Sequence, residues 1–273
     1  MKYVFIKTHS KQFSITLMCQ LFKVSRSGFY SYCTRPLSSQ QRANEELDKK
    51  ITTIFNHHKK RYGAPRITRV LKSHNEQCSH TRVARRMKQM GLVAVAKKKF
   101  KVTTDSEHHL PVYSNVLNRD FSTTSINQKW ACDITYIRTQ EGWLYLAVVI
   151  DLYSRAVIGW SMSKRMKKSL VFDALMMALF KRKFPKNVIV HSDRGSQYCS
   201  KKYQTILKNY RLIGSMSRKS NCWDNAIAES FFHTLKVELV HECIYTTREQ
   251  ARLSLFHYLE VYYNKNRMHS AID

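Results

Sequence analysis

The order of apolar segments in the second half of the chain constrains the fold more than any other feature. In some segments there, apolar residues recur every two residues, which is typical of strands, and in others they recur every 3.6 residues, which is typical of helices. The expected elements are strands at 130–137, 143–151 and 156–160, a helix at 169–180, a strand at 188–191, a helix at 201–209, a strand at 211–214, and helices near 224–240 and 246–263.

Three strands, a helix, a strand, a helix, a strand and closing helices form the order of a ribonuclease-H-like α/β domain. We therefore expect a mixed five-stranded sheet flanked by helices, with the first three strands joined by tight turns. This core, with its C-terminal helices, is predicted at 125–273. The polar, proline-ended stretch before it suggests a linker at 105–124.

The first part, residues 1–104, is helical in pattern and is expected to bind DNA. A helix over 14–22, a tight turn and a second helix capped by Ser25 outline a helix-turn-helix. Three further helices are expected at 41–57, 67–73 and 81–90. On the last of these, basic residues share one face at i, i+3 and i+4 spacing and are predicted DNA contacts: Arg82, Arg85 and Arg86. A solvated basic face is the simpler alternative.

The charge balance favours a polyanionic partner. The chain holds 47 Lys and Arg against 19 Asp and Glu, a formal charge of +28. Such a chain repels itself unless a polyanion neutralises it, and nucleic acid is the expected one. No apolar run approaches the roughly 20 residues of a membrane span, and the first residues lack a secretory signal, so no membrane contact and a cytoplasmic location are expected.

The 7 cysteines carry no recognisable framework. They are odd in number and widely scattered, and none forms a Cys-x-x-Cys pair, which argues against disulfides and a zinc ribbon. His74, Cys78 and His80 lie close in sequence, but without a second cysteine pair we interpret this as chance.

Carboxylates are scarce in this basic chain, and three of them stand at informative places. Asp133 lies within the first expected strand, Asp193 directly follows the strand at 188–191, and Glu229 is on the helix that begins near 224. If the two strands are neighbours, the aspartates emerge together and the helix can lay Glu229 over them. Three close carboxylates repel unless a cation joins them, and Mg²⁺, a hard ion that also binds phosphate, suits oxygen ligands best.

The spacing makes the signal specific. Asp193 and Glu229 are separated by 35 residues, and Lys236 follows Glu229 by seven, on the same helical face. With the segments Trp130-x-x-Asp133-Ile134-Thr135-Tyr136, His191-Ser192-Asp193-Arg194-Gly195-Ser196-Gln197-Tyr198 and Trp223-Asp224-Asn225-Ala226-x-x-Glu229-Ser230-Phe231-Phe232, the chain resembles bacterial insertion-sequence transposases of the IS-three group, whose catalytic core is of the retroviral-integrase type.

The resemblance implies a DDE-type transposase and integrase, a polynucleotidyl transferase. It implies metal-dependent DNA strand cleavage at element ends and strand transfer into other DNA during transposition. Position by position, it makes Asp133, Asp193 and Glu229 the catalytic residues and the ligands of two Mg²⁺ (or Mn²⁺) ions, with Asp133 bridging both. Lys236, a point charge near the ions, would bind DNA phosphate.

The resemblance extends over nearly the whole chain. It includes Val24-Ser25-Arg26-Ser27-Gly28-Phe29-Tyr30 upstream and Tyr262-Tyr263-Asn264-x-x-Arg267-x-His269-Ser270 near the end. It implies double-stranded DNA, both element ends and target, as partner, a homo-oligomer on DNA, and a nucleoid-associated protein of bacteria. Members of the group are usually second-frame products joined to an upstream segment and normally continue further, so an upstream-frame partner or fusion and a shortened C-terminus are expected.

Other interpretations of the same residues remain open. A regulator would bind DNA without cleaving it, and a ribonuclease-H-type nuclease would hydrolyse DNA without joining strands. A non-enzymatic basic scaffold would account for the charge but not for the three acids. Asp151 is expected in a hairpin contact or paired with Arg155, Asp224 as a helix cap, and His191 as structural. The tryptophans 130, 160 and 223 are most simply core residues, although Trp223 could instead stack on a base.

Overall fold

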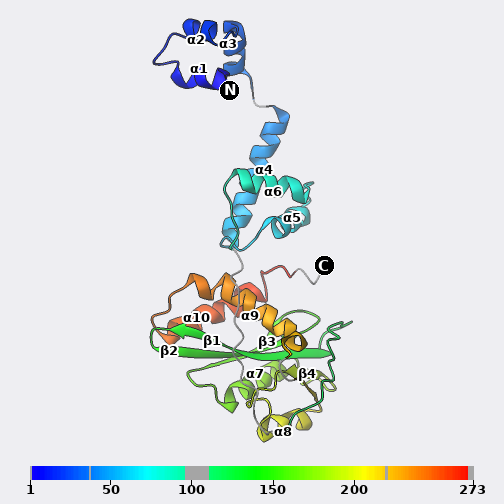
Figure 1. Cartoon of the computed structure of the whole chain (residues 1–273). Coiled ribbons are helices and arrows are strands. Elements are labelled where there is room, and N and C mark those ends of the chain that lie inside the picture. Colours follow the sequence, from blue (N-terminus) through cyan, green and yellow to red (C-terminus); the bar gives the residue numbers. More distant parts are fainter. Residues whose placement is uncertain (1, 37, 96–110, 219–220, 270–273) are drawn as a thin grey trace. The chain divides into compact units, whose positions relative to one another are not determined.

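The computed structural model describes residues 2–36, 38–95, 111–218 and 221–269 (Figure 1). The chain divides into two compact units, Met1–Ala94 and Val95–Asp273. The predicted junction at 104/105 lies outside the described residues. Residues 111–124, predicted as linker, contribute contacts to the second unit, because Leu117 is buried in its core.

The first unit is helical, as predicted. Its first three helices are α1 (Lys2–His9), α2 (Ile15–Leu21) and α3 (Arg26–Thr34), and its next three are α4 (Ser39–His57), α5 (Ala64–Ser73) and α6 (His80–Gln89). Ser25 caps α3 by accepting a hydrogen bond from the Gly28 amide, which confirms the expected helix-turn-helix outline. A small core of Ile6, Met18, Cys19 and Phe29 holds α1 to α3 together.

The second unit contains the predicted mixed five-stranded sheet. Its strands are β1 (Lys129–Thr139), β2 (Gly142–Asp151), β3 (Val157–Ser163), β4 (Ile189–Ser192) and β5 (Ile213–Met216), in the spatial order β3-β2-β1-β4-β5. The pairs β1–β2 and β2–β3 are antiparallel, whereas β4 pairs in parallel with both β1 and β5. The fifth strand starts two residues later than expected, since Arg211 adopts a left-handed conformation (φ 54°) after the preceding helix.

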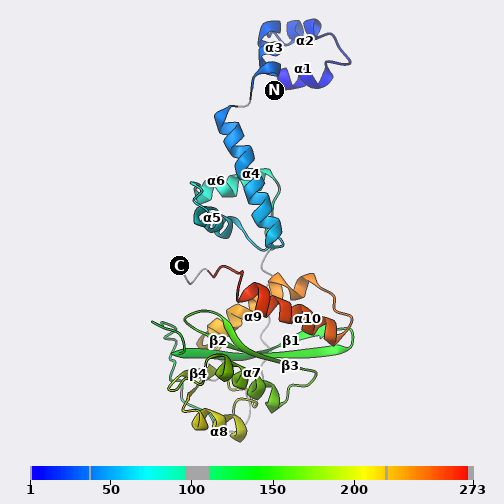
Figure 2. The same ribbon diagram turned by 180° about the vertical axis from the view of Figure 1, so that it is seen from behind.

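Helices cover both faces of the sheet (Figures 1 and 2). One face carries α7 (Lys168–Lys181) and α8 (Lys201–Asn209), and the other carries α9 (Ala226–Glu238), α10 (Arg248–Phe256) and the π-helix η3 (His257–Tyr263). Alternate side chains of the central strand serve the two cores: Ala131 packs with α9, whereas Trp130 and Cys132 pack with α7 and α8. The neighbouring strands β1 and β4 are thus held between two apolar layers.

The segment 264–267, which follows η3, is fastened to β3 and to α9. Asn264 accepts a hydrogen bond from the Val157 amide (2.9 Å) and donates one to its carbonyl (2.9 Å). Arg267 pairs with Glu238 through Nη2–Oε1 (2.9 Å), and Tyr258 donates to the same carboxylate (2.8 Å). These contacts hold α10 and η3 against the helix that carries Glu229.

Candidate active site

The two predicted aspartates lie side by side because β1 and β4 are parallel neighbours. Their register pairs Ala131 with His191, and two residues further along each segment stand Asp133 and Asp193. Asp193 leaves the sheet directly after β4, where its Oδ1 accepts a hydrogen bond from the Gly195 amide (2.9 Å). Asp133 Oδ1 accepts one from the Ile134 amide (2.7 Å). Both residues are half-buried.

Glu229 reaches the same place from the first turn of α9. This helix packs on the sheet face that carries Ala131, through Ala228, Phe231, Phe232 and Leu235. Because residues 131 and 133 of a strand point to the same face, Asp133 is directed toward α9. The Asn225 amide group donates to the Cys132 carbonyl (3.2 Å), so the start of α9 is fixed beside Asp133.

The three carboxylates are close enough to perturb one another. Burial raises the pKa of Asp133 well above its usual range, and the negative charges of Asp193 and Glu229 raise it further. The hydrogen bond from the Ile134 amide and the charge of Lys236 lower this pKa in part. Burial also raises the pKa of Glu229. The structure therefore brings the three predicted acids into one electrostatic cluster that favours either protons or a cation.

Lys236 borders this cluster two turns after Glu229. Its ammonium lies over the Tyr136 ring, 5.0 Å from the centroid. Burial lowers the pKa of Lys236, and the charge of Asp133 partly opposes that shift. A cation held between an aromatic face and the acids is well placed to meet an incoming anion.

Known domain families match both units of the chain. The integrase core domain matches residues 124–222 and 229–272, and an HTH-like domain matches residues 41–100. Transposase InsF for insertion sequence IS3A of Escherichia coli (strain K12) is 52% identical over 272 residues, which cover 99% of this chain and 94% of that protein. The chain belongs to the IS3 family of transposases.

A second relative of this transposase is the IS600 31 kDa protein of Shigella sonnei, 41% identical over 255 residues, which are 93% of this chain and 94% of that protein. Among solved structures, the HTLV-2 integrase catalytic core domain in complex with magnesium aligns with 19% identity and a TM-score of 0.40, over 53% of this chain and 90% of that one. By its family, the transposase is an enzyme with an integrase catalytic core, and its function is the transposition of an insertion sequence by DNA cleavage and strand transfer.

The acids of the transposase do not form a ready-made metal site. Within the described ranges, no three His, Cys, Asp or Glu side chains are grouped so that they could hold a metal ion. The described ranges include Asp133, Asp193 and Glu229 and also His74, Cys78 and His80. The ligand roles of Asp133, Asp193 and Glu229 remain a prediction.

The turn that leads into α9 is anchored by Asp224, a residue whose role the sequence did not reveal. Its side chain is fully buried and does not cap α9, contrary to expectation, because it is occupied by arginines. Arg218 donates from Nε (2.9 Å) and Nη2 (2.8 Å), and Arg119 donates from Nε (2.7 Å). Asn115 adds a further hydrogen bond (3.0 Å). These hydrogen bonds, of which those from Arg218 have the largest effect, hold the pKa of Asp224 well below its usual range.

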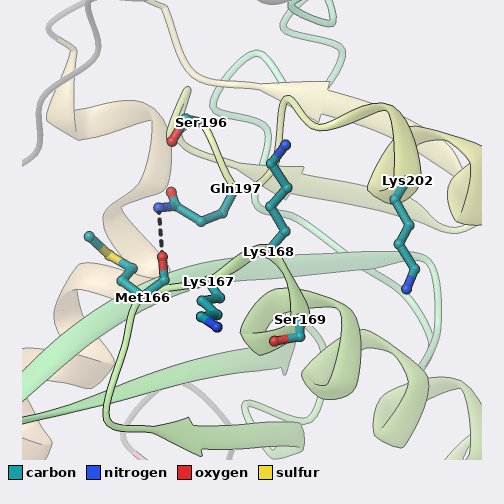
Figure 3. A pocket seen from close by; sticks show the side chains of 7 residues that line it. All are labelled: Met166, Lys167, Lys168, Ser169, Ser196, Gln197 and Lys202. Atoms are coloured by element: carbon teal, nitrogen blue, oxygen red, sulfur yellow. Dashed lines mark hydrogen bonds between the residues drawn. The ribbon is translucent and has the colours of Figure 1, made fainter.

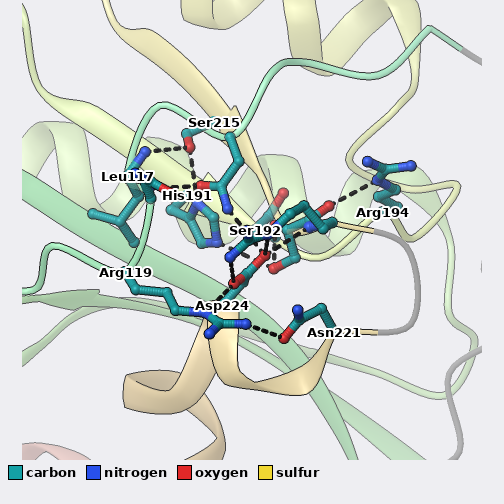
Figure 4. Close-up of polar contacts among 12 residues, drawn as sticks. Leu117, Arg119, His191, Ser192, Arg194, Ser215, Asn221 and Asp224 are labelled. Carbon is teal, nitrogen blue, oxygen red and sulfur yellow. Dashed lines mark hydrogen bonds and ion pairs between the residues drawn. The ribbon is translucent and has the colours of Figure 1, made fainter.

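A second part of this network fixes the strand end before Asp193 (Figure 4). His191 is fully buried between the hydroxyls of Ser215 (2.8 Å) and Ser217 (3.1 Å), and burial lowers its pKa to about 4. Arg194 donates to the Ser217 carbonyl (2.7 Å). His191 therefore stays neutral and structural at physiological pH, as expected. Residues 215–218 contact both the strand end before Asp193 and Asp224, which precedes α9.

Asp224→Asn is expected to loosen this turn and reduce DNA cleavage while DNA affinity is retained. The amide keeps the shape but loses the charge that satisfies Arg119 and Arg218. Hydrogen exchange of the first turn of α9 should become faster. In the wild type, a lowered carboxyl pKa contributes stability above about pH 4 that is lost as the pH falls through the folded-state pKa. The variant should lack this acid-dependent loss in exchange protection. Unchanged exchange and cleavage would show that Asp224 does not position Glu229.

The predicted DNA-contacting arginines differ in their surroundings. Arg86 forms a bidentate pair with Asp48 of α4, and Arg82 donates to Asn44 (2.9 Å). Both therefore fasten α6 to α4, whereas Arg85 is exposed. Arg82 and Arg86, predicted as part of a DNA-binding face, therefore contact α4 within the protein. DNA binding by this helix stays a prediction, and among the three arginines the exposed Arg85 suits it best.

Two other expectations concern residues near the site. Asp151 makes the expected hairpin contact, accepting from the Ser154 amide (2.8 Å) and also from the Asn127 amide (2.8 Å). Trp130 is fully buried, as expected for a core residue, but Trp223 is 70% exposed. The core interpretation of Trp223 was wrong because the residue lies in the short helix η1 (Cys222–Asn225), outside the apolar face of α9.

Proposed function

We propose that the transposase cleaves DNA at its element ends and transfers the cut strands at one site made by Asp133, Asp193 and Glu229, with divalent ions bound. The observation that carries this proposal is geometric: Asp133 and Asp193 follow the paired residues of β1 and β4 by two positions each, and Glu229 lies in the first turn of α9, which packs on the same face of the sheet. At neutral pH, three neighbouring ionised carboxylates repel one another unless a positive charge lies between them. A cluster of acids in a basic chain is therefore more typical of a functional site than of a structural one.

The donor set fits Mg²⁺ or Mn²⁺, since all three side chains offer oxygen ligands. Asp133, Asp193 and Glu229 would together hold the ions, with Asp133 contributing to both, Asp193 to one and Glu229 to the other. Bound ions would supply a deprotonated nucleophile and neutralise charge on the leaving oxygen. The protein's part is to hold the three oxygens: β1 and β4 fix the aspartates, and the Asn225 and Asp224 contacts fix the start of α9.

Two phosphodiester exchanges then follow at the same site. Water attacks the phosphodiester at the element end, and the 3′-oxygen leaves as a hydroxyl. That hydroxyl attacks a phosphodiester of the second DNA, so one bond forms as another breaks and no ATP is needed. Lys236, held over Tyr136 beside the acids, binds a DNA phosphate and keeps the strand aligned.

We further infer the partners from this chemistry. Double-stranded DNA is the substrate in both steps, and cutting and joining two ends requires at least two protomers. The helical unit, with its HTH-like domain, is the proposed reader of the element end. Because the transposase acts on bacterial DNA, we infer that it is located at the nucleoid. The product of the upstream reading frame remains a candidate partner. No described helix is both long and apolar enough to cross a bilayer.

A strand-transfer assay tests the proposed function. Purified transposase is incubated with a labelled duplex that ends in a pre-cut element end and with a supercoiled plasmid. Joined products should form with Mg²⁺ or Mn²⁺, and removal of the metal with EDTA should abolish them. Hydrolysis of the duplex without joining, by a protein that binds the ends, would instead identify a nuclease of ribonuclease-H type.

A further inference from the structure

A basic pocket adjoins the loop of Asp193 and has no part in the chemistry described above. It encloses about 560 Å³, in the range of ligand sites. Its lining residues are Met166, Lys167, Lys168, Ser169, Ser196, Gln197 and Lys202 (Figure 3). Ser196 and Gln197 follow Asp193 by three and four residues, so part of the lining belongs to the loop after Asp193.

The other walls come from the starts of two helices. Lys168 and Ser169 begin α7, a helix of 14 residues, and Lys202 lies in the first turn of α8. The residue at the N-cap of α7, Lys167, makes no side-chain capping bond, and neither helix has an acid in its first turn. The N-cap of α8, Ser200, accepts a hydrogen bond from the Tyr203 amide, so the positive charge of this region comes mainly from its lysines.

The side chains of the pocket favour an anion of tetrahedral, oxygen-rich shape. Three lysines and two serines offer donors, and no lining residue carries a negative charge. Gln197 donates to the Met166 carbonyl (3.4 Å), which ties the Asp193 loop to the segment before α7. Lys202 lies over the Phe172 ring, 4.6 Å from its centroid, which holds its ammonium near the start of α7.

We propose that this pocket binds a backbone phosphate of the DNA strand that passes the active site, with Lys168 and Lys202 as the charged contacts. The lining offers hydrogen-bond donors and charge but no free aromatic face, so it suits the phosphodiester and not the base. The inference rests on the proposed function, because DNA is taken as the substrate. The phosphate could belong to the element end or to the target, and the two sources can be separated by experiment.

The test measures DNA binding in Ca²⁺ buffer by fluorescence anisotropy, without a catalytic readout. One probe is a duplex carrying the terminal repeat of the element, and the other is a duplex of equal length with scrambled sequence. The double variant K168Q/K202Q is compared with K186Q/K208Q, which removes the same charge from exposed lysines outside the pocket, Lys208 being on α8 itself. Melting temperatures check that both variants fold.

K168Q/K202Q should bind about tenfold more weakly near 0.1 M salt, and the slope of log K against log salt should fall by about 1 for each phosphate that the protein no longer neutralises. The affinity should be restored by K168R/K202R and unchanged in K186Q/K208Q. Weaker binding confined to the terminal-repeat duplex assigns the phosphate to the element end, and weaker binding of both duplexes assigns it to DNA of either kind.

Equally weakened binding in the two double variants, or wild-type binding by K168Q/K202Q, would overturn the pocket proposal. Both results are independent of strand transfer. A wild-type protein that binds DNA through this pocket but never joins strands would overturn the proposed function and leave the phosphate site standing.

Discussion

Asp193→Asn is expected to lower end cleavage and strand transfer by at least about 10³-fold, because charge stabilisation at a metal-dependent site contributes several kcal/mol to the transition state. Glu229→Gln and Asp133→Asn should behave alike. DNA affinity in Ca²⁺ buffer should change by less than a factor of about three, since the amides keep the shape of the acids. Cleavage of a labelled end duplex and anisotropy of the same duplex measure both quantities.

Asp173→Asn serves as the matched control, since this exposed acid on α7 loses the same charge away from the site. It should cleave at the wild-type rate. Cleavage by Asp193→Asn within tenfold of the wild type would remove Asp193 from the mechanism.

The acid cluster also has an expected signature in stability. A raised carboxyl pKa means that ionised Asp133 costs folding free energy, a cost absent below about pH 4 and complete once the pH exceeds the folded-state pKa. In EDTA at neutral pH, Asp133→Asn should therefore melt no lower than the wild type. Added Mn²⁺ should raise the melting temperature of the wild type more than that of the variant. An identical response of both proteins would contradict a cation at this cluster.

Arg267→Ala is expected to destabilise the catalytic unit by about 3–5 kcal/mol, because it leaves the buried Glu238 carboxylate without its cation. Glu238 and Arg267 are 8% and 6% exposed at their side chains, and the guanidinium also lies over the Tyr263 ring. Its removal should free the end of the chain from α9. Urea unfolding followed by tryptophan fluorescence measures the change, with Trp130 reporting on the core.

Two further variants separate the effects of charge and of packing. Arg267→Lys keeps the charge but loses the bidentate geometry, and should retain only part of the stability. The double variant Glu238→Gln with Arg267→Ala should be more stable than Arg267→Ala alone, since no unpaired charge remains. If the double variant is the less stable of the two, Glu238 is not the reason for the destabilisation.

Much of the catalytic unit was predictable because its apolar periods are strong. The segment 143–151 is apolar almost throughout, as in a strand buried on both faces, and the predicted helix at 201–209 matches α8 residue for residue. The spacing of Asp133, Asp193 and Glu229 was informative because acids are rare in this chain. The apolar period depends only on residues that are close in sequence, so it predicts helices and strands without knowledge of the tertiary structure.

Partners distant in the chain were not predictable. Nothing in the pattern of α6 distinguishes Arg85, which is exposed, from Arg86, which pairs with Asp48 across to α4. Asp224 was expected to cap the next helix, yet Arg119, 105 residues away, and Arg218 hold it instead. The pocket beside Asp193 joins the starts of two helices, and no single segment of sequence contains it.

The amino-acid sequence alone determined the order of strands and helices and indicated the family, and it singled out Asp133, Asp193 and Glu229 as the predicted catalytic acids. Only the tertiary structure decided that β4 lies beside β1, that α9 covers the face of Asp133, and that the pocket lysines gather around the Asp193 loop. The physical reason is that hydrophobic periodicity and helix capping act over a few residues. Charge–charge effects and burial, by contrast, depend on distances in space that exist only after the sheet has assembled.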